Sequence, residues 1–336
     1  MKKLNVTLAI LVAAVMAGNA QTNSTNTVYS DIVGYHTKTI STGLNSVGLP
    51  LLKSDLVKTT ATSVTGNSIL LSGETNFGAK LNSAKSYYVE VYSGTLKGDR
   101  FDVDVAGSIA AANGGVVLNA SSGNNTFPSA SIGSNLNNQT IAVREHITLA
   151  ELDSYLSVPA VGSNSLASAD AVGFTESGAL IFYSKKSDGT WKRSGNSSDF
   201  STKVIPPGVG VFLKKVGSSV TLTQVGSVRE NDFAFPLTTQ LTLVTPGYPM
   251  DMSPTTLGVV PGAAATDWTG GTVASGDSIS RVESGALIKY TLKPDGSINR
   301  SGNSSDFKNT TLFSSSEAQL IKRSKANADL LVGKPF

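Results

Sequence analysis

One segment of the chain occurs twice, at 176–200 and again at 283–307. The two copies read ESGALIFYSKKSDGTWKRSGNSSDF and ESGALIKYTLKPDGSINRSGNSSDF, and 18 of the 25 positions are identical without a gap. An internal repeat of this kind indicates that one structural unit is present more than once. We therefore predict two homologous units, at 143–228 and 229–336. A shorter echo, Val-Arg-Glu at 143–145 and at 228–230, precedes each copy.

Each copy carries the sequence of a tight β-turn. The letters SDG at 187–189 and PDG at 294–296 suit a type I turn that is closed by a glycine with a positive φ angle. Apolar and polar residues alternate on both sides of the turn, as they do in half-buried strands. The repeat is therefore predicted to be a β-hairpin with a three-residue loop.

The loop length fixes which residues of this hairpin lie opposite each other. With three residues in the loop, Lys185 pairs with Trp191 and Leu292 pairs with Ile298. One apolar face then holds Ile181, Tyr183 and Trp191 in the first copy, and Ile288, Tyr290, Leu292 and Ile298 in the second. A two-residue loop would move Trp191 and Ile298 to the other face, so we predict the longer, bulged loop.

Short apolar runs broken by glycine, asparagine, serine and proline continue through the rest of the chain. Alternation with a period of two is clear in YYVEVY and RFDVDV, whereas a helical period is confined to 148–156 and 315–331. We predict an all-β, β-dominated fold with tandem sandwich-like or barrel-like units, built from short antiparallel strands and hairpins. Residues 31–142 are predicted to form an N-terminal β domain or a diverged third repeat.

The first 20 residues have the pattern of a secretory signal peptide. Lys2 and Lys3 precede an apolar stretch, and Gly18 and Ala20 suit a signal-peptidase site. The apolar stretch is short for the alternative, a helix that anchors the chain in a membrane. We predict a signal peptide at 1–20, a flexible leader at 21–30 and no transmembrane helix after cleavage. Export is expected to the cell surface or extracellular space, with the periplasm also open.

Composition narrows the classes of partner. The chain has no cysteine and therefore no disulfide framework, and removal of the signal peptide would leave it nearly neutral. Because no basic stripe with interleaved aromatic residues occurs, we do not expect nucleic acid as a partner. Charged residues make up only 15% of the chain, so serine, threonine, asparagine and glycine must cover its surface. Such a surface suits self-association, contact with other surface proteins, or polysaccharide.

Residues able to carry out catalysis are scarce. The histidines are His36 and His146, and no nucleophile-elbow, phosphate-loop or zinc-site motif occurs. Asp99, Asp102 and Asp104 are close in sequence and could hold calcium or act as acid and base. Their alternation with apolar residues predicts instead the solvent-facing side of a strand. We expect no enzyme activity, no cofactor and no metal.

The polar loop RSGNSSDF ends each copy of the repeat. Its glycine can turn the chain and its polar side chains can bond to their own backbone, so we favour a structural brace. Binding residues are often found on loops, which leaves a pair of ligand sites open. The candidate ligand-binding residues are Arg193, Asn196 and Asp199, the equivalent Arg300, Asn303 and Asp306, and Trp268. Trp268 lies in a predicted loop where it could stack on a sugar, although packing is favoured.

Five segments together form a pattern. They are the strand pair at 33–52 that ends NSVGLPLL, YYVEVYSGTLKGDRFDV at 87–103, REHITLAE at 144–151, the hairpin at 176–195 and PPGVGVFLKK at 206–215. With these segments the chain resembles an uncharacterised family of exported, signal-peptide-bearing bacterial β-rich proteins. The resemblance covers most of 31–230; it implies export and a β fold, and no activity. The C-terminal unit departs from it, because FSSSEAQLIKR stands where the last strand is expected.

The leading functional hypothesis is an exported cell-surface or extracellular structural or adhesive protein without catalytic activity. Repeated β units with polar faces can associate edge to edge. A carbohydrate-binding module is one alternative. An outer-membrane β-barrel is another, prompted by the alternating strands and the terminal Phe336.

Overall fold

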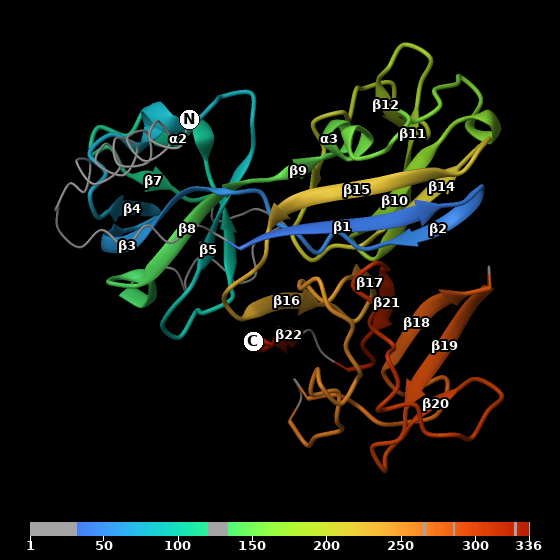
Figure 1. Ribbon diagram of the computed structural model, residues 1–336. Helices are drawn as coiled ribbons and strands as arrows, with labels where there is room; N and C mark the ends of the chain where they lie inside the picture. Colours follow the sequence, from blue (N-terminus) through green and yellow to red (C-terminus); the bar gives the residue numbers. More distant parts are fainter. Residues whose placement is uncertain (1–31, 120–133, 265–266, 285, 326–327, 336) are drawn as a thin grey trace, which may run out of the picture. The chain divides into compact units, whose positions relative to one another are not determined.

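The computed structural model describes residues 32–119, 134–264, 267–284, 286–325 and 328–335 (Figure 1). The predicted signal peptide and leader lie outside these residues. Strands contain 43% of the residues and helices 7%, which confirms the all-β class. No helix within the described ranges is long and apolar enough to cross a membrane.

A six-stranded antiparallel sheet forms the first region. Its spatial order is β6 (Arg100–Asp102), β5 (Tyr87–Val91), β8 (Thr140–Glu145), β3 (Asp55–Thr65), β4 (Ser68–Leu71) and β7 (Val116–Val117). The short helices of this region are η1 (Phe77–Lys80), α2 (Val105–Ile109) and η3 (Ser134–Leu136). Phe77 and Phe101 are completely buried in its core.

A five-stranded antiparallel sheet forms the second region. Its order is β12 (Trp191–Arg193), β11 (Ala179–Lys185), β10 (Ala171–Glu176), β14 (Val211–Lys215) and β2 (Gly43–Val47). Two strand pairs accompany it, β1 (Val33–Ile40) with β15 (Val220–Ser227) and β9 (Ile147–Thr148) with β13 (Val204–Ile205), as do α3 (Leu149–Ser154) and η4 (Leu166–Ser168). Leu222 of β15 and Trp191 of β12 belong to one core. The β1–β15 pair and the five-stranded sheet therefore enclose this core together.

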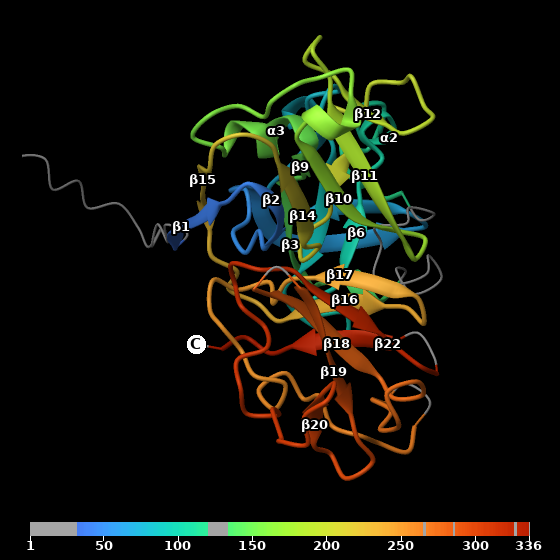
Figure 2. The ribbon, with the colours of Figure 1, turned by 90° about the vertical axis from the view of Figure 1, so that its right-hand side faces the viewer.

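The third region repeats this arrangement. Its five-stranded sheet has the order β20 (Ile298–Arg300), β19 (Ala286–Leu292), β18 (Ser278–Glu283), β21 (Gln319–Lys322) and β17 (Leu241–Val244). The accompanying pair is β16 (Phe233–Leu237) with β22 (Ala328–Val332). Figure 2 shows β18, β19 and β20 side by side in this sheet.

The second and third regions thus have the same strand order. The equivalent strands are β1 and β16, β2 and β17, β10 and β18, β11 and β19, β12 and β20, β14 and β21, and β15 and β22. We call the copies repeat A (33–52 and 146–227) and repeat B (231–332). Repeat A begins before the six-stranded sheet, so residues 55–145 form an inserted domain within it. This strand pairing crosses the domain boundary that the sequence predicted after residue 142.

Both hairpins have the predicted register. Lys185 pairs with Trp191, and Leu292 pairs with Ile298. The last glycine of each loop has a positive φ angle, 85° in the first copy and 83° in the second. The tyrosines of the predicted apolar faces are buried in the two cores. The three-residue, glycine-closed loop is therefore confirmed in both copies.

One predicted helix exists and the other does not. Helix α3 lies within 148–156 and begins with a capping box, in which Thr148 and Glu151 each accept a hydrogen bond from the other's backbone N–H. Residues 315–331 form β21 and part of β22 instead of a helix. Strand β21 fills the place between β17 and β18, so sheet pairing outweighs a weak helical period. It also occupies the position of β14, where the sequence had left a strand in doubt.

The acidic segment at 99–104 is not the solvent-facing side of a strand. Strand β6 ends at Asp102, whose carboxylate lies 3.0 Å from Nε2 of His146. Asp104 begins α2 and accepts a hydrogen bond from the backbone N–H of Gly107. Asp99 is only 2% exposed. The alternation that predicted a longer strand is broken because Asp104 caps a helix.

Candidate functional site

The two repeats contact each other with approximate twofold symmetry. Strand β10 of repeat A lies against β17 of repeat B, and β18 of repeat B lies against β2 of repeat A. Equivalent backbone atoms form hydrogen bonds on both sides of the symmetry axis: Gly48 N donates to Ser316 O at 3.0 Å, and Thr245 N donates to Gly208 O at 2.8 Å. The repeats therefore pair like the subunits of a twofold dimer, within one chain.

The centre of this contact is apolar and closely packed. Phe212 of repeat A is buried against Leu243 and Ala318 of repeat B. The hydroxyl of Ser46 accepts a hydrogen bond from Ala318 N and donates one to Ala318 O. The hydroxyl of Ser46 is thus paired in both directions, and the open space lies at one end of the contact.

Three charged side chains close one end of the contact. Glu317 lies 3.5 Å from the ammonium group of Lys38 and 3.2 Å from the guanidinium group of Arg281. Arg281 also donates to the backbone oxygen of Thr311 at 2.7 Å. The Lys38–Glu317 pair connects repeat A to repeat B, and the Arg281–Glu317 pair holds the glutamate in place within repeat B.

The opposite end is apolar at the same three positions. The strand registers make Phe235 the counterpart of Lys38 and Phe174 the counterpart of Arg281. Glu317 lies two residues before β21, and Val209 lies two residues before the equivalent strand β14, so these two residues also correspond. The three apolar residues line a groove of about 540 Å³ between the repeats. We call it the inter-repeat groove.

The rim of the inter-repeat groove is polar. Glu176 lies 3.1 Å from the ammonium group of Lys203 and accepts a 2.5 Å hydrogen bond from the hydroxyl of Tyr183. Burial, together with this hydrogen bond, raises the pKa of Tyr183, so the hydroxyl remains a donor at neutral pH. The opposite wall comes from repeat B, from the turn between β16 and β17 and from the start of β17. It contributes Thr238, Gln240, Leu241 and Thr242.

The repeats approach each other closely at one point of this rim. Gly178 has a φ angle of 77°, and a Cβ atom on it would lie 2.1 Å from Oε1 of Gln240. A side chain at this position would therefore collide with the facing wall. The preceding residue, Ser177, also has a positive φ angle of 47°. The equivalent Ser284 of repeat B has a φ angle of 49°, so this backbone conformation belongs to the hairpin turn itself.

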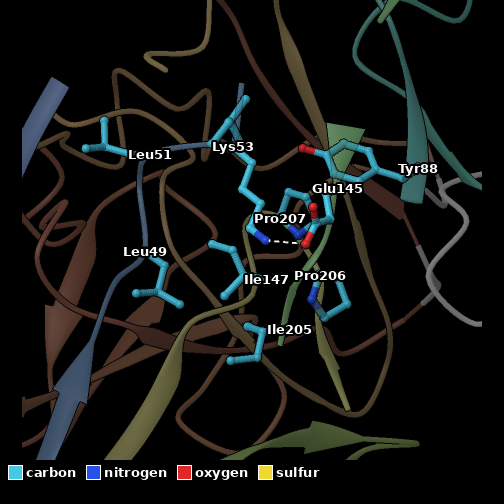
Figure 3. Close-up of a pocket in the computed structure, with 10 residues that line it drawn as sticks. Leu49, Leu51, Lys53, Tyr88, Glu145, Ile147, Ile205, Pro206 and Pro207 are labelled. Carbon is cyan, nitrogen blue, oxygen red and sulfur yellow. Dashed lines mark hydrogen bonds and ion pairs between the residues drawn. The ribbon is translucent and has the colours of Figure 1, made fainter. Parts of the chain in front are cut away.

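A smaller hollow lies beside the inserted domain (Figure 3). Its volume of about 10 Å³ is room for about one water molecule. Lys53 and Lys85 both contact the carboxylates of Glu145 and Glu151 there. Burial alone would raise the pKa of Glu145, but the hydrogen bonds from the two lysines outweigh it and lower the pKa. This group of charges ties the inserted domain to repeat A, and the hollow is too small for a substrate.

The Val-Arg-Glu echo places two arginines on one buried carboxylate. Glu90 of β5 is 0% exposed; it contacts Arg229, and Nε of Arg144 lies 3.5 Å from it. Arg144 also forms a 2.6 Å ion pair with Asp55. Burial lowers the pKa of Arg229 to about 10, which still leaves it charged at neutral pH. Because all of these groups are enclosed, we interpret them as the attachment of the inserted domain to the linker between the repeats.

The two RSGNSSDF loops bind mainly to their own backbone. Asp199 accepts hydrogen bonds from the N–H groups of Trp191 and Ser201, and Asp306 accepts the two equivalent ones. Asn196 and Asn303 each accept from the N–H two residues further on. These contacts support the brace interpretation.

The arginines of the loops differ slightly. Arg193 is exposed, and Arg300 lies 3.5 Å from Glu283 at the surface. The loops follow β12 and β20, which belong to different sheets. The six predicted ligand residues thus form two separate groups of three rather than one site.

Trp268 is largely enclosed. Its side chain is 8% exposed and belongs to the core of repeat B. The guanidinium group of Arg323 lies 4.8 Å from its ring centroid. Its edge lines a surface hollow of about 740 Å³, so only a small part of the ring is available to a ligand.

Sequence reasoning did not find the inter-repeat groove. Phe174 of its floor, and Arg281 at the equivalent position of the closed end, lie two residues before the near-identical segments begin. A comparison extended by those two positions would have shown the replacement of a charge by an aromatic ring. Among the described residues, no group of three or more histidine, aspartate or glutamate side chains could hold a metal ion.

Comparison with protein-family models, with curated proteins and with solved structures gave no match. The resemblance to an exported bacterial family therefore stays a prediction.

Proposed function

We propose that this chain is an exported structural or adhesive protein of the cell surface or extracellular space, and that it acts by association rather than catalysis. The observation that supports this proposal is the outer face of the β1–β15 sheet. Tyr35 of β1 lies opposite Val225 of β15, and the next two pairs on this face consist of threonines. Tyr35 is 71% exposed and Val225 is 58% exposed. No charged side chain interrupts the face formed by these pairs.

The edge of this sheet favours association as well. Among the described residues, β1 pairs with β15 alone. Its counterpart β16 is covered on the equivalent edge, where Ala234 N donates to the backbone oxygen of Gly98 in the inserted domain. An uncovered edge next to an exposed apolar face is a usual place for pairing between chains. Strand β1 combines both properties.

The test is the assembly state of the mature chain. We expect its mass, measured by light scattering after gel filtration, to rise with concentration and the protein to adhere to an abiotic surface. The double variant Tyr35→Lys/Val225→Lys should be monomeric and non-adherent with an unchanged melting temperature. Val158→Lys, at another exposed apolar residue, is the matched control and should behave like the parent. A parent chain that is monomeric and non-adherent at every concentration overturns the proposal.

A further inference from the structure

We propose that the inter-repeat groove binds a short neutral saccharide. This inference goes beyond self-association and uses a different surface. The proposal is based on the difference between the two ends of the contact between repeat A and repeat B. Lys38, Arg281 and Glu317 close one end with ion pairs, whereas the equivalent residues leave a cavity at the other.

The floor of the groove has apolar residues at the three positions that carry charged residues at the closed end. Phe174, Val209 and Phe235 stand at the positions of a network that would otherwise join the repeats. A contact that only needed to hold the repeats together could use the charged set at both ends. The volume of about 540 Å³ lies within the range of small-molecule sites, ~300–1,000 Å³. The structure therefore has a ligand-sized cavity at the end of the contact where its symmetry would allow the same three charged residues as at the closed end.

The charges around the groove favour a neutral ligand. Glu176 and Lys203 form an ion pair at the rim and cancel each other. Arg100, at the wall, donates to the backbone oxygen of Pro207 and lies 5.7 Å from the ring centroid of Phe235. An anion would meet the carboxylate of Glu176, and a cation would meet two basic groups. Because Arg100 is buried and bonded to Pro207, the accessible charges are those of the Glu176–Lys203 ion pair, which is neutral.

The polar groups of the rim favour hydroxyl groups on the ligand. The carboxylate of Glu176 accepts hydrogen bonds, the ammonium group of Lys203 donates them, and the amide of Gln240 can do both. The C–H face of a sugar ring fits an apolar floor, and its hydroxyls fit a rim of this composition. A saccharide is the ligand class that uses both the floor and the rim.

The experiment is a calorimetric titration of the mature chain with neutral cello-, xylo-, malto- and chito-oligosaccharides. Oligogalacturonate serves as an anionic probe and a peptide with the sequence of residues 21–31 as a peptide probe. We expect one neutral series to bind with a stoichiometry of one per chain. Binding of the anionic probe or the peptide alone overturns the proposal, and so does the absence of binding to any neutral series at millimolar concentration.

Two variants locate the site. The triple variant Phe174→Arg/Val209→Glu/Phe235→Lys installs the charges of the closed end, and we expect at least a tenfold loss of affinity. Because two of these residues are buried, Leu241→Glu at the exposed wall provides a second test that leaves the core intact. Leu287→Glu, at an exposed leucine outside the groove, is the matched control. Unchanged affinity in folded Leu241→Glu overturns the assignment to this groove, whatever the assembly state.

Discussion

Repeat A and repeat B share a buried ion pair that the sequence did not reveal. Asp170 lies 2.7 Å from the ammonium group of Lys215, and Asp277 lies 3.0 Å from Nε of Arg323. Both aspartates also accept hydrogen bonds from two backbone N–H groups at equivalent positions, one before and one after them in the chain. This arrangement fixes the same three chain segments in each repeat.

The repeats differ where they meet other parts of the molecule. Within the described ranges, no strand or loop pairs with the free edge of β1, whereas the inserted domain covers that of β16. The two ends of the contact between the repeats also differ, being charged at one end and apolar at the other. Function is commonly built onto a framework in this manner. The two repeats therefore share their framework and differ on their surfaces.

The largest expected effect comes from the shared ion pair. Asp170→Ala and Asp277→Ala each remove the carboxylate that pairs with a buried cation and accepts from two backbone N–H groups, so each should lower the free energy of unfolding by about 3–5 kcal/mol. Urea denaturation measures this, with the exposed Lys325→Ala as control. A loss below about 1 kcal/mol in one repeat only would break the equivalence of the two sites.

The next effect concerns Asp99 of the inserted domain, which lies near Asp329 of repeat B. Burial, and then the nearby carboxylate of Asp329, raise the pKa of Asp99 to about 8. The folded chain holds this proton up to about pH 8, whereas the unfolded chain releases it near pH 4, so stability falls as the pH rises between these values.

Asp99→Asn removes this dependence. We expect the variant to be more stable than the parent at pH 8, by an amount on the order of a few kcal/mol, since one pKa unit corresponds to about 1.4 kcal/mol. The difference should disappear toward pH 4. Melting temperatures across this range test it, and parallel curves for variant and parent would show that Asp99 is ionised in the folded chain.

A smaller effect tests the repeated polar loop. Asp199→Ala and Asp306→Ala should each cost about 1–2 kcal/mol, because each leaves two backbone N–H groups without their acceptor. Similar losses in denaturant unfolding would support a brace in both copies. Unchanged stability, together with a lost ligand, would favour the binding interpretation of the loop instead.

The smallest effect is expected at the loop arginines. Arg193 is exposed, and the ion pair between Arg300 and Glu283 is at the surface, where such pairs contribute little. Arg193→Ala and Arg300→Ala should change the free energy of unfolding by less than about 0.5 kcal/mol. A larger change at Arg300 alone would show that its ion pair distinguishes the repeats.

The hairpin was predictable because its information is local. The turn residues and the alternation around them set the register, and Trp191 and Ile298 are on the expected faces. The equivalence of β1 and β16 was not predictable, since VGYHTKTI and FAFPL share no pattern and face different neighbours. Only the pairing of each strand with a distant partner shows that they correspond.

The candidate site could not be predicted from the sequence for the same reason. Phe174 and Phe235 are far apart in the chain, and neither stands in a motif. Their common position depends on how two sheets pack, which no local pattern encodes. The helix expected at 315–331 was wrong because a weak period cannot show that a sheet has a vacant place beside β18.

The inserted domain enters and leaves through strands that pair with each other. Asp55 at the start of β3 lies opposite Arg144 near the end of β8. The two crossing points are therefore neighbours, and repeat A closes around them as it would around a short turn. A domain with adjacent ends could be exchanged at this point only if it also supplied a carboxylate for Arg229 and a backbone acceptor for the edge of β16, as the present one does.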